Sequence, residues 1–357
     1  MEGGEFTPQS LELDELAQHN DPLGRLAGVF RGMAAEIYDR ELRLRRAIQT
    51  ARGSLMVIAA GVFWGIAPAL SRLASEHGSD PIGLAIAVNI VSGIICIAVA
   101  VHRGAFPKLQ WADLRFFLIW SVINGVLTRV TLMFAAEHVE ASMLALIATL
   151  QSFGVFAFAA MTRTERPTPR RLFGLLLGLV GVGIVLVTRF EPSEASSRIW
   201  IFLSLALPLL YAIEWMVLES KLPRRIDTVA SVGIMMLLSA VMIVPIALIS
   251  GGSLMFGPTT PALTFIVIVM GVCGGATTVL CLITLCSTGA VFASLSSYAM
   301  TIAGIIWGLL LLNEHLSTTA WVSVALVICG LYFVGPKAGD ERVTLNRSFL
   351  DQKTKQT

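Results

Sequence analysis

Charged residues are scarce in this chain: they make up 14% of its 357 residues, whereas 55% are hydrophobic and the mean hydropathy is +0.76. Soluble domains are about 25% charged, so this composition excludes a soluble globular fold for a chain of this length. The sequence also has no Walker A motif and no H-E-x-x-H motif. The net charge of +2 gives no reason to expect nucleic acid as a partner.

Neither the cysteines nor the aspartates of this chain are spaced as a metal site or a catalytic centre would require. The five cysteines show no CxxC or Cys/His spacing, so we expect neither a metal site nor a disulfide framework, and we interpret them as small core residues. No aspartate lies inside the apolar runs described next, which excludes an intramembrane enzyme with paired aspartates. The sequence therefore predicts a protein that is not an enzyme and needs no cofactor.

Long apolar runs dominate the chain between Leu55 and Val334. A helix needs about 20 residues at 1.5 Å each to cross a hydrocarbon layer about 30 Å thick. Each run is long enough, or nearly so, and ends at a short polar or basic break. We therefore predict ten membrane-spanning helices, at Leu55–Leu73, Pro81–Val101, Leu114–Ala135, Ala141–Met161, Leu172–Val187, Trp200–Leu218, Val229–Ile249, Leu263–Leu285, Ala290–Leu312 and Thr319–Val334.

Lysine and arginine are distributed unevenly between the two sides of these spans. Twenty flank the spans on the side that holds both chain ends, and three lie on the other side, at Arg72, Arg189 and Arg198. Because cytoplasmic loops are enriched in Lys and Arg, this asymmetry predicts both termini in the cytoplasm. We expect a multi-pass protein of the cell membrane, the inner membrane of a bacterium, surrounded by the lipid bilayer.

The two halves of the apolar region resemble each other weakly. Offsets of 149 and 147 residues superimpose acidic, glycine, hydroxyl and aromatic positions. Each half holds five spans, so the second copy enters the membrane from the opposite side and the halves form an inverted repeat. The matched positions are Glu165 with Glu314, Gly181 with Gly330, Ser152 with Thr301, and residues 63–67 with 210–214.

This repeat gives the predicted fold class and its division. We predict an all-α polytopic membrane protein whose ten transmembrane helices form two inverted five-helix repeats. The repeats cover 53–189 and 198–336, with a cytoplasmic extension at 1–52 and a cytoplasmic tail at 337–357. Inverted repeats supply two near-equivalent conformations, open to either side, around a site near the membrane midplane where the copies meet.

The most distinctive local pattern comprises residues 289–294, Trp307-Gly308, Asn313-Glu314, Trp321 and 328–330. It resembles the ten-helix branch of the drug/metabolite transporter superfamily, the EamA-type permeases, and the resemblance extends from about Leu55 to Pro336. That family typically ends the fourth helix of each repeat with an acidic residue and has a glycine late in the fifth, and both features occur in both halves. The family often carries a proline in each fourth helix, where this chain has Gln151 and Met300.

Two charged side chains fall well inside the predicted spans: Arg129 in the third and Glu214 in the sixth. A charge near the bilayer centre costs about 2.5–3.5 kcal/mol on insertion scales, so each requires an explanation. Arg129 lies beyond the middle of its span toward the outside and Glu214 toward the cytoplasm, at backbone depths that differ by about 14 Å. This separation favours a shared water-filled cavity over a direct ion pair.

Each charge has a structural and a functional interpretation. A salt bridge or hydrogen bond inside the bundle could fix packing without meeting a substrate. Alternatively, the guanidinium of Arg129 offers a planar fork to a carboxylate or phosphate of a substrate. Glu214 could bind a cationic group or carry a proton for coupling, because burial favours the protonated form of a carboxyl. Together the two residues suit a zwitterion such as an amino acid.

Aromatic and amide side chains extend the predicted substrate site. Trp64 and Tyr211 are matched in the repeat and are candidates for an aromatic wall, with core packing as the alternative. Asn89 and Gln151 are candidates because their amides are not easily satisfied inside a helix, although they could also join helices.

Hydroxyl-bearing faces are the remaining candidates. Tyr298 and Thr301 share one helical face with Ser294 and Ser297 in the ninth span. Such faces either join helices or line a wet cavity. Similar faces occur in the third and eighth spans, formed by Asn124, Thr128 and Thr131, and by Thr277, Cys281 and Thr284.

A stripe of small residues runs along the fifth span. Gly174, Gly178 and Gly181 include a small-xxx-small pair, which lets helix backbones approach closely. The stripe could pack within the bundle or against a second copy of the chain. The sequence is therefore compatible with both a monomer and a homodimer.

The first fifty residues differ from the rest of the chain. Residues 1–21 carry six acidic and no basic side chains, which is typical of a disordered lead. Apolar residues at helical spacing then predict a cytoplasmic amphipathic helix that could lie on the membrane surface. The alternatives are a passive extension and a start codon assigned too early, ahead of Met33 or Met56. The spaced apolar residues are Leu23, Leu26, Phe30, Met33, Ile37, Leu44 and Ile48.

Together these patterns favour a secondary transporter. We expect an exporter of a small metabolite, amino-acid-like or amphipathic, that works by alternating access and is coupled to protons or simply follows the substrate gradient. The alternative from another class is a membrane-embedded scaffold or sensor that acts through its N-terminal extension. That alternative leaves the inverted repeat and the buried charges without a role.

Overall fold

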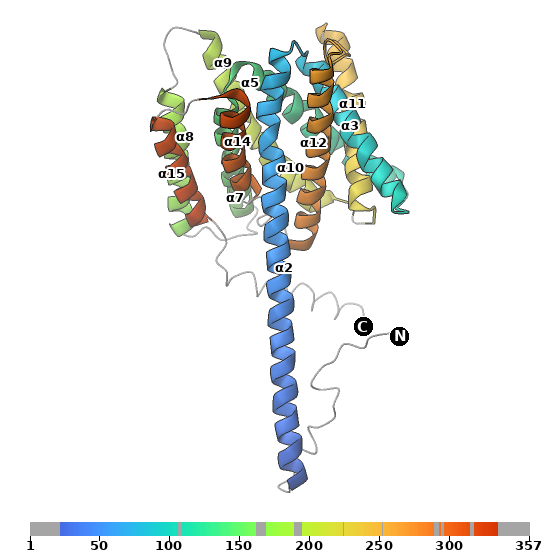
Figure 1. The fold of residues 1–357 in the computed structure, drawn as a ribbon, viewed down its shortest axis with the longest axis vertical. Coiled ribbons are helices and arrows are strands. Elements are labelled where there is room, and N and C mark those ends of the chain that lie inside the picture. Colours follow the sequence, from blue (N-terminus) through green and yellow to red (C-terminus); the bar gives the residue numbers. More distant parts are fainter. Residues whose placement is uncertain are drawn as a thin grey trace. The chain divides into compact units, whose positions relative to one another are not determined.

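The computed structural model describes residues 22–105, 109–161, 169–188, 195–223, 225–251, 253–288, 293, 296–314 and 318–334. Over these residues the chain is helical and contains no strand (Figure 1). Residues 1–55 and 56–357 form two separate units. The candidate site described below lies entirely within the second unit.

Seven helical segments of the described chain are long and apolar enough to cross a membrane. They are Ala51–Glu76, Pro81–His102, Asp113–His138, Ala141–Phe158, Phe202–Glu219, Thr228–Ile249 and Pro261–Ser287. Each coincides with a span expected from the sequence. The expected fifth, ninth and tenth spans appear as shorter apolar helices, at Leu172–Gly181, Ala299–Leu312 and Trp321–Gly330.

The first helix, α2, runs without a break from Pro22 to Glu76. Its first part therefore contains the helix that the apolar spacing predicts for the extension. Leu26, Phe30 and Ile37 on this part are each more than half exposed. α2 continues through Gly53 and Ser54 into the first span.

The remaining helices follow at short intervals. After α3 (Pro81–His102), the third span consists of α4 (Trp111–Trp120), the π-helix η2 (Ser121–Thr128) and α5 (Arg129–His138). The fourth span consists of α6 (Ala141–Ala148) and α7 (Leu150–Met161), and α8 (Pro169–Thr188) follows it. The second half comprises α9 (Ala195–Ser204), α10 (Ala206–Lys221), α11 (Thr228–Ser250), α12 (Pro261–Thr288), α14 (Ser296–Leu312) and α15 (Thr318–Val334).

The fourth span is interrupted although it lacks the proline that the family often has there. The α-helical pattern stops at Ala148 and resumes at Leu150, and the hydroxyl of Thr149 donates a hydrogen bond to the carbonyl of Leu146. A side chain that bonds to its own backbone can bend a helix in this way. The interruption lies two residues before Gln151, whereas Met300 lies inside the uninterrupted α14.

Glycines bring equivalent helices of the two halves close together. On the α3–α11 pair, Gly93 lies under Leu237 and Gly233 lies under Ile97. On the α8–α15 pair, Gly330 packs against Gly178. Between α3 and α11, Gly93 contacts Leu237 and Ile97 contacts Gly233, so residue numbers rise along one helix as they fall along the other. These two helices therefore run antiparallel.

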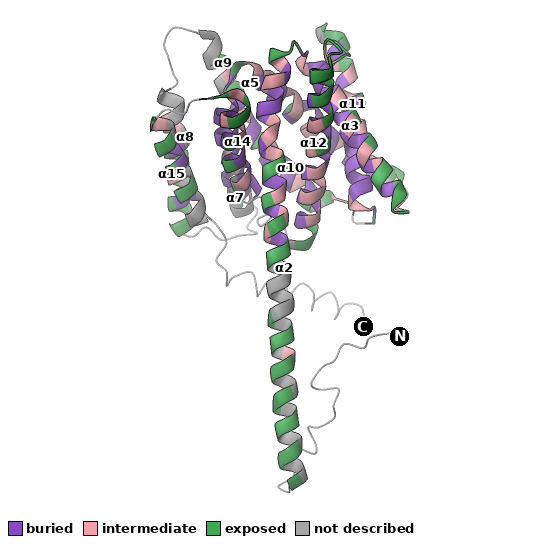
Figure 2. Ribbon diagram, in the orientation of Figure 1, coloured by how far each residue is buried: buried purple, intermediate pink, exposed green. Residues whose placement is uncertain are grey.

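The two faces of the helices differ in what they contact. Buried residues lie where helices face each other, and large apolar side chains such as Phe173, Leu310 and Trp321 are exposed (Figure 2). Lipid is as apolar as a protein core, so such surfaces are expected on a membrane protein. The interpretation of all cysteines as core residues is wrong for Cys286 and Cys329, which are exposed, because a cysteine is equally compatible with an apolar lipid-facing surface.

Candidate functional site

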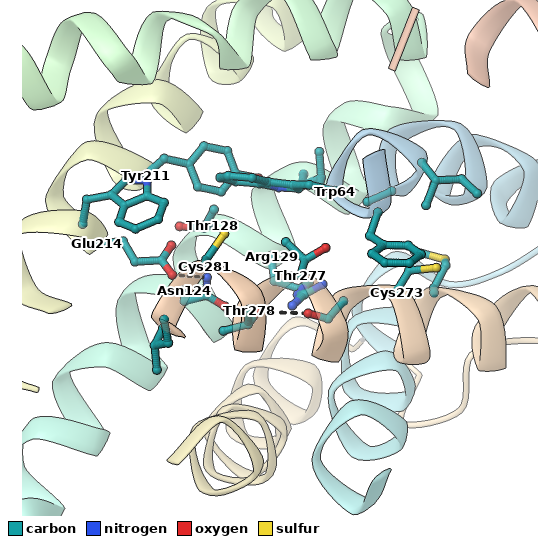
Figure 3. A pocket seen from close by; sticks show the side chains of 18 of the residues that line it. Trp64, Asn124, Thr128, Arg129, Tyr211, Glu214, Cys273, Thr277, Thr278 and Cys281 are labelled. Carbon is teal, nitrogen blue, oxygen red and sulfur yellow. Dashed lines mark hydrogen bonds between the residues drawn. The ribbon is translucent and has the colours of Figure 1, made fainter. Parts of the chain in front are cut away.

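A cavity of about 70 Å³ lies among α2, η2, α5, α10 and α12 (Figure 3). One water needs about 10–15 Å³ of such space, so the cavity has room for several water molecules. Its wall is mostly apolar, with a few polar groups that converge on it. The polar residues are Asn124, Thr128, Arg129, Glu214, Thr277 and Thr278, and the aromatic residues are Phe63, Trp64, Tyr211 and Trp215.

Arg129 supplies the positive charge of this cavity. It is the first residue of α5, and its guanidinium lies over Gly274 of α12: a Cβ atom at Gly274 would be 3.6 Å from Nη1 and 3.9 Å from Nη2. The sulfur of Met236 lies 3.8 Å from Nη2. No carboxylate of the described residues forms an ion pair with this guanidinium. A thioether is a weak acceptor, so the described residues satisfy the five N–H groups of Arg129 poorly.

Glu214 supplies the negative charge. It lies on α10 and is 8% exposed. Its Oε1 accepts a hydrogen bond of 2.7 Å from the side-chain amide of Asn124, which Figure 3 shows as a dashed line. The indole N–H of Trp120 is buried near this carboxyl but outside hydrogen-bonding geometry. Asn124 therefore orients the carboxyl of Glu214 at the cavity wall.

The two charges share the cavity and are not joined by an ion pair. Each interacts electrostatically with the other, yet no atoms of Arg129 and Glu214 come within ion-pair distance. The different membrane depths that the sequence predicts for the two residues favour this arrangement over a direct ion pair. Both side chains line the cavity.

The π-helix places Asn124 and Arg129 together. The backbone N–H of Arg129 donates to the carbonyl of Asn124, five residues earlier. In an α-helix two residues five apart would point about 140° away from each other, and the wider turn brings them toward one side. Single π-turns occur frequently at functional sites. No feature of the sequence indicates this π-helical segment.

Trp64 and Tyr211 touch each other on the cavity wall. Their ring centroids are 4.9 Å apart and the rings are nearly perpendicular, at 84°. This edge-to-face geometry is favourable for aromatic pairs. The two residues come from the first and sixth spans, so the positions matched in the repeat meet directly.

Three predicted site residues with described side chains, Asn89, Gln151 and Thr301, do not line the cavity. Asn89 and Gln151 are fully buried, and their amide atoms have no hydrogen-bond partner among the described residues. Thr301 donates to the carbonyl of Ser297, 2.8 Å away. Tyr298 lies on α14, and its side chain is outside the described part of the structure. Of the predicted site residues with described side chains, four therefore line the cavity and three lie elsewhere.

The hydroxyl-bearing helical faces predicted from the sequence also divide between residues that line the cavity and residues that form hydrogen bonds elsewhere. Thr128, Thr277 and Cys281 line the cavity, whereas Thr284 donates to its own helix at Leu280. Ser297 interacts with Ser152 at 2.6 Å and so joins α14 to α7. Ser294 lies outside the described residues.

Several wall residues were not singled out from the sequence: Phe63, Trp215, Cys273, Gly274 and Thr278. Phe63 adjoins Trp64 within the matched stretch 63–67, and Trp215 adjoins Glu214, so the sequence carried a signal for both positions. Cys273 and Gly274 lie one helical turn before Thr277 and Thr278, and helical periodicity could have suggested them. No group of three or more His, Cys, Asp or Glu residues in the described chain could hold a metal ion.

Apolar helices long enough to cross a membrane, arranged around an internal cavity with two charges, define a multi-pass membrane protein. The chain matches the EamA-like transporter family over residues 51–187 and again over residues 198–335. It belongs to this family, which confirms the resemblance seen in the sequence and makes the protein a membrane transporter of small solutes.

Comparison with solved structures gives information about the fold alone. No curated protein matches the chain. A solved structure described as "Crystal structure of protein" is similar with a TM-score of 0.56 and 17% sequence identity, over 80% of this chain and 97% of that one. At this identity the similarity shows a shared fold and carries no information about substrate.

Proposed function

We propose that this protein is a secondary transporter that binds a small solute through an anionic group at Arg129 and moves it by alternating access. The observation that carries the proposal is the guanidinium of Arg129, which lines the cavity with the Met236 sulfur as its hydrogen-bond acceptor. A carboxylate or phosphate oxygen would satisfy the N–H groups of Arg129 that the described residues leave without a strong acceptor. No nucleotide is required.

The proposed architecture has ten spans in two inverted repeats, with the shorter helices α8, α14 and α15 also crossing the membrane. The antiparallel course of α3 and α11 supports this arrangement, because each is the second helix of its repeat. The excess of Lys and Arg at the connections supports cytoplasmic termini. The bundle would then present the cavity alternately to the two sides.

The proposed substrate has groups of both signs, as an amino-acid-like metabolite has. Arg129 would hold the anionic group, and Glu214, oriented by Asn124, would hold a cationic one. Trp64 and Tyr211 give the wall between them an apolar, aromatic character, so an amphipathic compound also fits. The direction that we propose is export.

We further propose that Glu214 carries the coupling proton. The carboxyl of Glu214 lies on the cavity wall. A carboxyl that binds the substrate and a proton in turn can couple the movement of the substrate to that of the proton. The alternative is a facilitator in which Glu214 only shapes the site. Collapse of the proton gradient distinguishes them, because only coupled transport would stop.

The experiment that tests this function compares metabolite profiles of cells and medium with and without the protein. A compound that the protein moves into the medium should stay in cells that carry Arg129→Gln. The exposed Arg115 of α4 supplies a control with the same change of charge, Arg115→Gln. Equal export by both variants would contradict the role of Arg129, and a compound that accumulates inside instead would contradict the direction.

One observation favours a scaffold or sensor as a second candidate. Leu26, Phe30 and Ile37 on the first part of α2 are exposed at helical spacing, which is a surface that a partner or a lipid layer could cover. Deletion of residues 1–50 separates the candidates. Transport should survive this deletion, whereas a signal that depends on the extension should not.

A further inference from the structure

Glu314 is the second residue after the end of α14 and is not among the residues that line the cavity. It is one of the two acidic residues that the internal repeat aligns, and the other, Glu165, lies outside the described residues. Asn313, immediately before it, has a positive φ of 50°, and the backbone N–H of Glu314 lies 3.3 Å from the carbonyl of Gly308. The chain thus reverses at the end of α14, and the side chain of Glu314 is directed back toward the bundle.

The carboxylate of Glu314 binds the start of α6. Its Oε1 accepts the backbone N–H of Ala141 at 2.8 Å and its Oε2 accepts the N–H of Ser142 at 3.1 Å. These are the first two residues of α6, whose N–H groups have no partner within the helix. The helix dipole adds to the attraction of a negative group at this point. A residue of the second repeat therefore caps a helix of the first.

The two helices also pack closely beneath this cap. A Cβ atom at Gly308 would lie 2.5 Å from Oε2 of Glu314 and 3.5 Å from the nitrogen of Ser142. One turn earlier, a Cβ atom at Gly304 would meet Ala145. Gly304 and Gly308 form a small-xxx-small pair that lets the backbones approach.

Both helices adjoin segments that carry the cavity wall. α6 is separated from α5 by two residues, and α5 begins with Arg129. α14 packs against α2 where Gly65 lies at the backbone of Gly304, and the neighbouring Trp64 lines the cavity. A change in the distance between α6 and α14 would therefore act on two walls of the cavity.

We propose that Glu314 and the N-terminus of α6 form a clasp that closes the external entrance to the cavity and must open for the cavity to face outward. The clasp rests on the proposed function, including the orientation that places this end of α6 outside. The hydrogen bonds of the clasp are formed in the present structure, which in this proposal represents the state closed on that side. Breaking the clasp shifts the population toward outward-open molecules, because it removes contacts that only the closed state makes.

The test measures how fast a cysteine in the cavity reacts from each side. Cys273 is the reporter, since it lines the cavity, in a chain whose other four cysteines are replaced by alanine. A membrane-impermeant thiol reagent is added to intact cells and, separately, to inside-out vesicles. No substrate is needed, so the result stands or fails independently of what the protein transports.

Two variants break the clasp by different routes. Glu314→Gln removes the charge and one acceptor. Ala141→Pro removes one donor without changing charge; proline is favoured at the first position of a helix, and the preceding Glu140 already has the extended conformation that a following proline requires, with φ −56° and ψ 142°. The control is Glu76→Gln, since Glu76 forms an i,i+4 pair with Arg72 and its side chain is 52% exposed.

We expect both clasp variants to raise the external labelling rate of Cys273 about fivefold or more, the lower end of usual coupling between sites, and to slow labelling from the cytoplasmic side. Glu76→Gln should leave both rates unchanged. Unchanged external labelling in a folded Ala141→Pro variant would overturn the clasp, even if Glu314→Gln fails to fold. An equal rise in Glu76→Gln would also overturn it. Loss of export in Arg129→Gln with normal labelling would concern the proposed function alone.

Discussion

Gly93 of α3 and Gly233 of α11 occupy equivalent places in the contact between their helices. A Cβ atom at Gly93 would lie 2.6 Å from Cγ of Leu237, and one at Gly233 would lie 2.7 Å from Cγ1 of Ile97. Leu237 follows Gly233 by four residues, as Ile97 follows Gly93. Each helix therefore places a glycine under an aliphatic side chain of the other. α3 also packs against α12 and α11 against η2, so this contact connects two walls of the cavity.

The first prediction concerns this contact. Gly93→Val and Gly233→Val should each destabilise the protein by about 1–3 kcal/mol, because added methyl groups overpack a filled contact. Thermal unfolding in detergent measures the change. Gly183→Ala is the control, because nothing lies within 4 Å of a Cβ atom at Gly183, and it should not lower the unfolding temperature. Equal unfolding temperatures for all three variants would contradict the symmetric contact.

The second prediction separates charge from geometry at Arg129. Arg129→Lys keeps the positive charge but loses the planar fork, so export should be strongly reduced if the substrate group is bound by two parallel hydrogen bonds. Arg129→Gln should abolish export. Both proteins should remain inserted and monodisperse by size-exclusion chromatography. Normal export by the lysine variant would mean that a point charge is sufficient.

The third prediction concerns pH. Export measured at a series of pH values should follow a titration that is absent in Glu214→Gln, because only the carboxyl can take up and release a proton. Asn124→Ala should weaken export while preserving the titration, since it removes the hydrogen bond that orients Glu214 but keeps the carboxyl. A pH profile that is the same in Glu214→Gln and in the unmodified protein would assign coupling to another group.

The fourth prediction concerns the aromatic wall. Tyr211→Phe keeps the ring contact with Trp64, and Tyr211→Ala removes it. The alanine variant should lose about 0.5–1.5 kcal/mol of aromatic pairing in addition to the buried area, and its apparent affinity for the exported compound should fall. The phenylalanine variant should keep both. A fall in affinity that is equal in the two variants would assign the role to the hydroxyl instead.

The fifth prediction concerns topology. Reporter fusions after Pro336 and after Arg170 should report a cytoplasmic position, and a fusion after Gly252 should report an external one, because Lys and Arg are concentrated at the first two sites. An odd number of spans per repeat requires the third site to lie outside. A cytoplasmic signal at Gly252 would contradict the inverted repeat.

The sequence indicated the repeat but not its contacts. Offsets of 149 and 147 residues aligned Glu165 with Glu314 and the Trp64 region with that of Tyr211, whereas the equivalence of Gly93 and Gly233 corresponds to an offset of 140. Loops of different length shift the register along the chain. The structure recovers the equivalence because packing acts on positions in space and is insensitive to loop length.

The sequence alone determined the apolar helices and the two charges that stand out among them, because helices in hydrocarbon must be long and apolar and a buried charge is too costly to retain without a role. Only the tertiary structure decided which polar groups meet. Arg129, Glu214, Trp64 and Tyr211 face one cavity, while Asn89 and Gln151 lie buried outside it. Which way a side chain points depends on the phase of its helix, and a π-turn at 121–128 or an interruption at Thr149 changes that phase without leaving a mark on composition or periodicity.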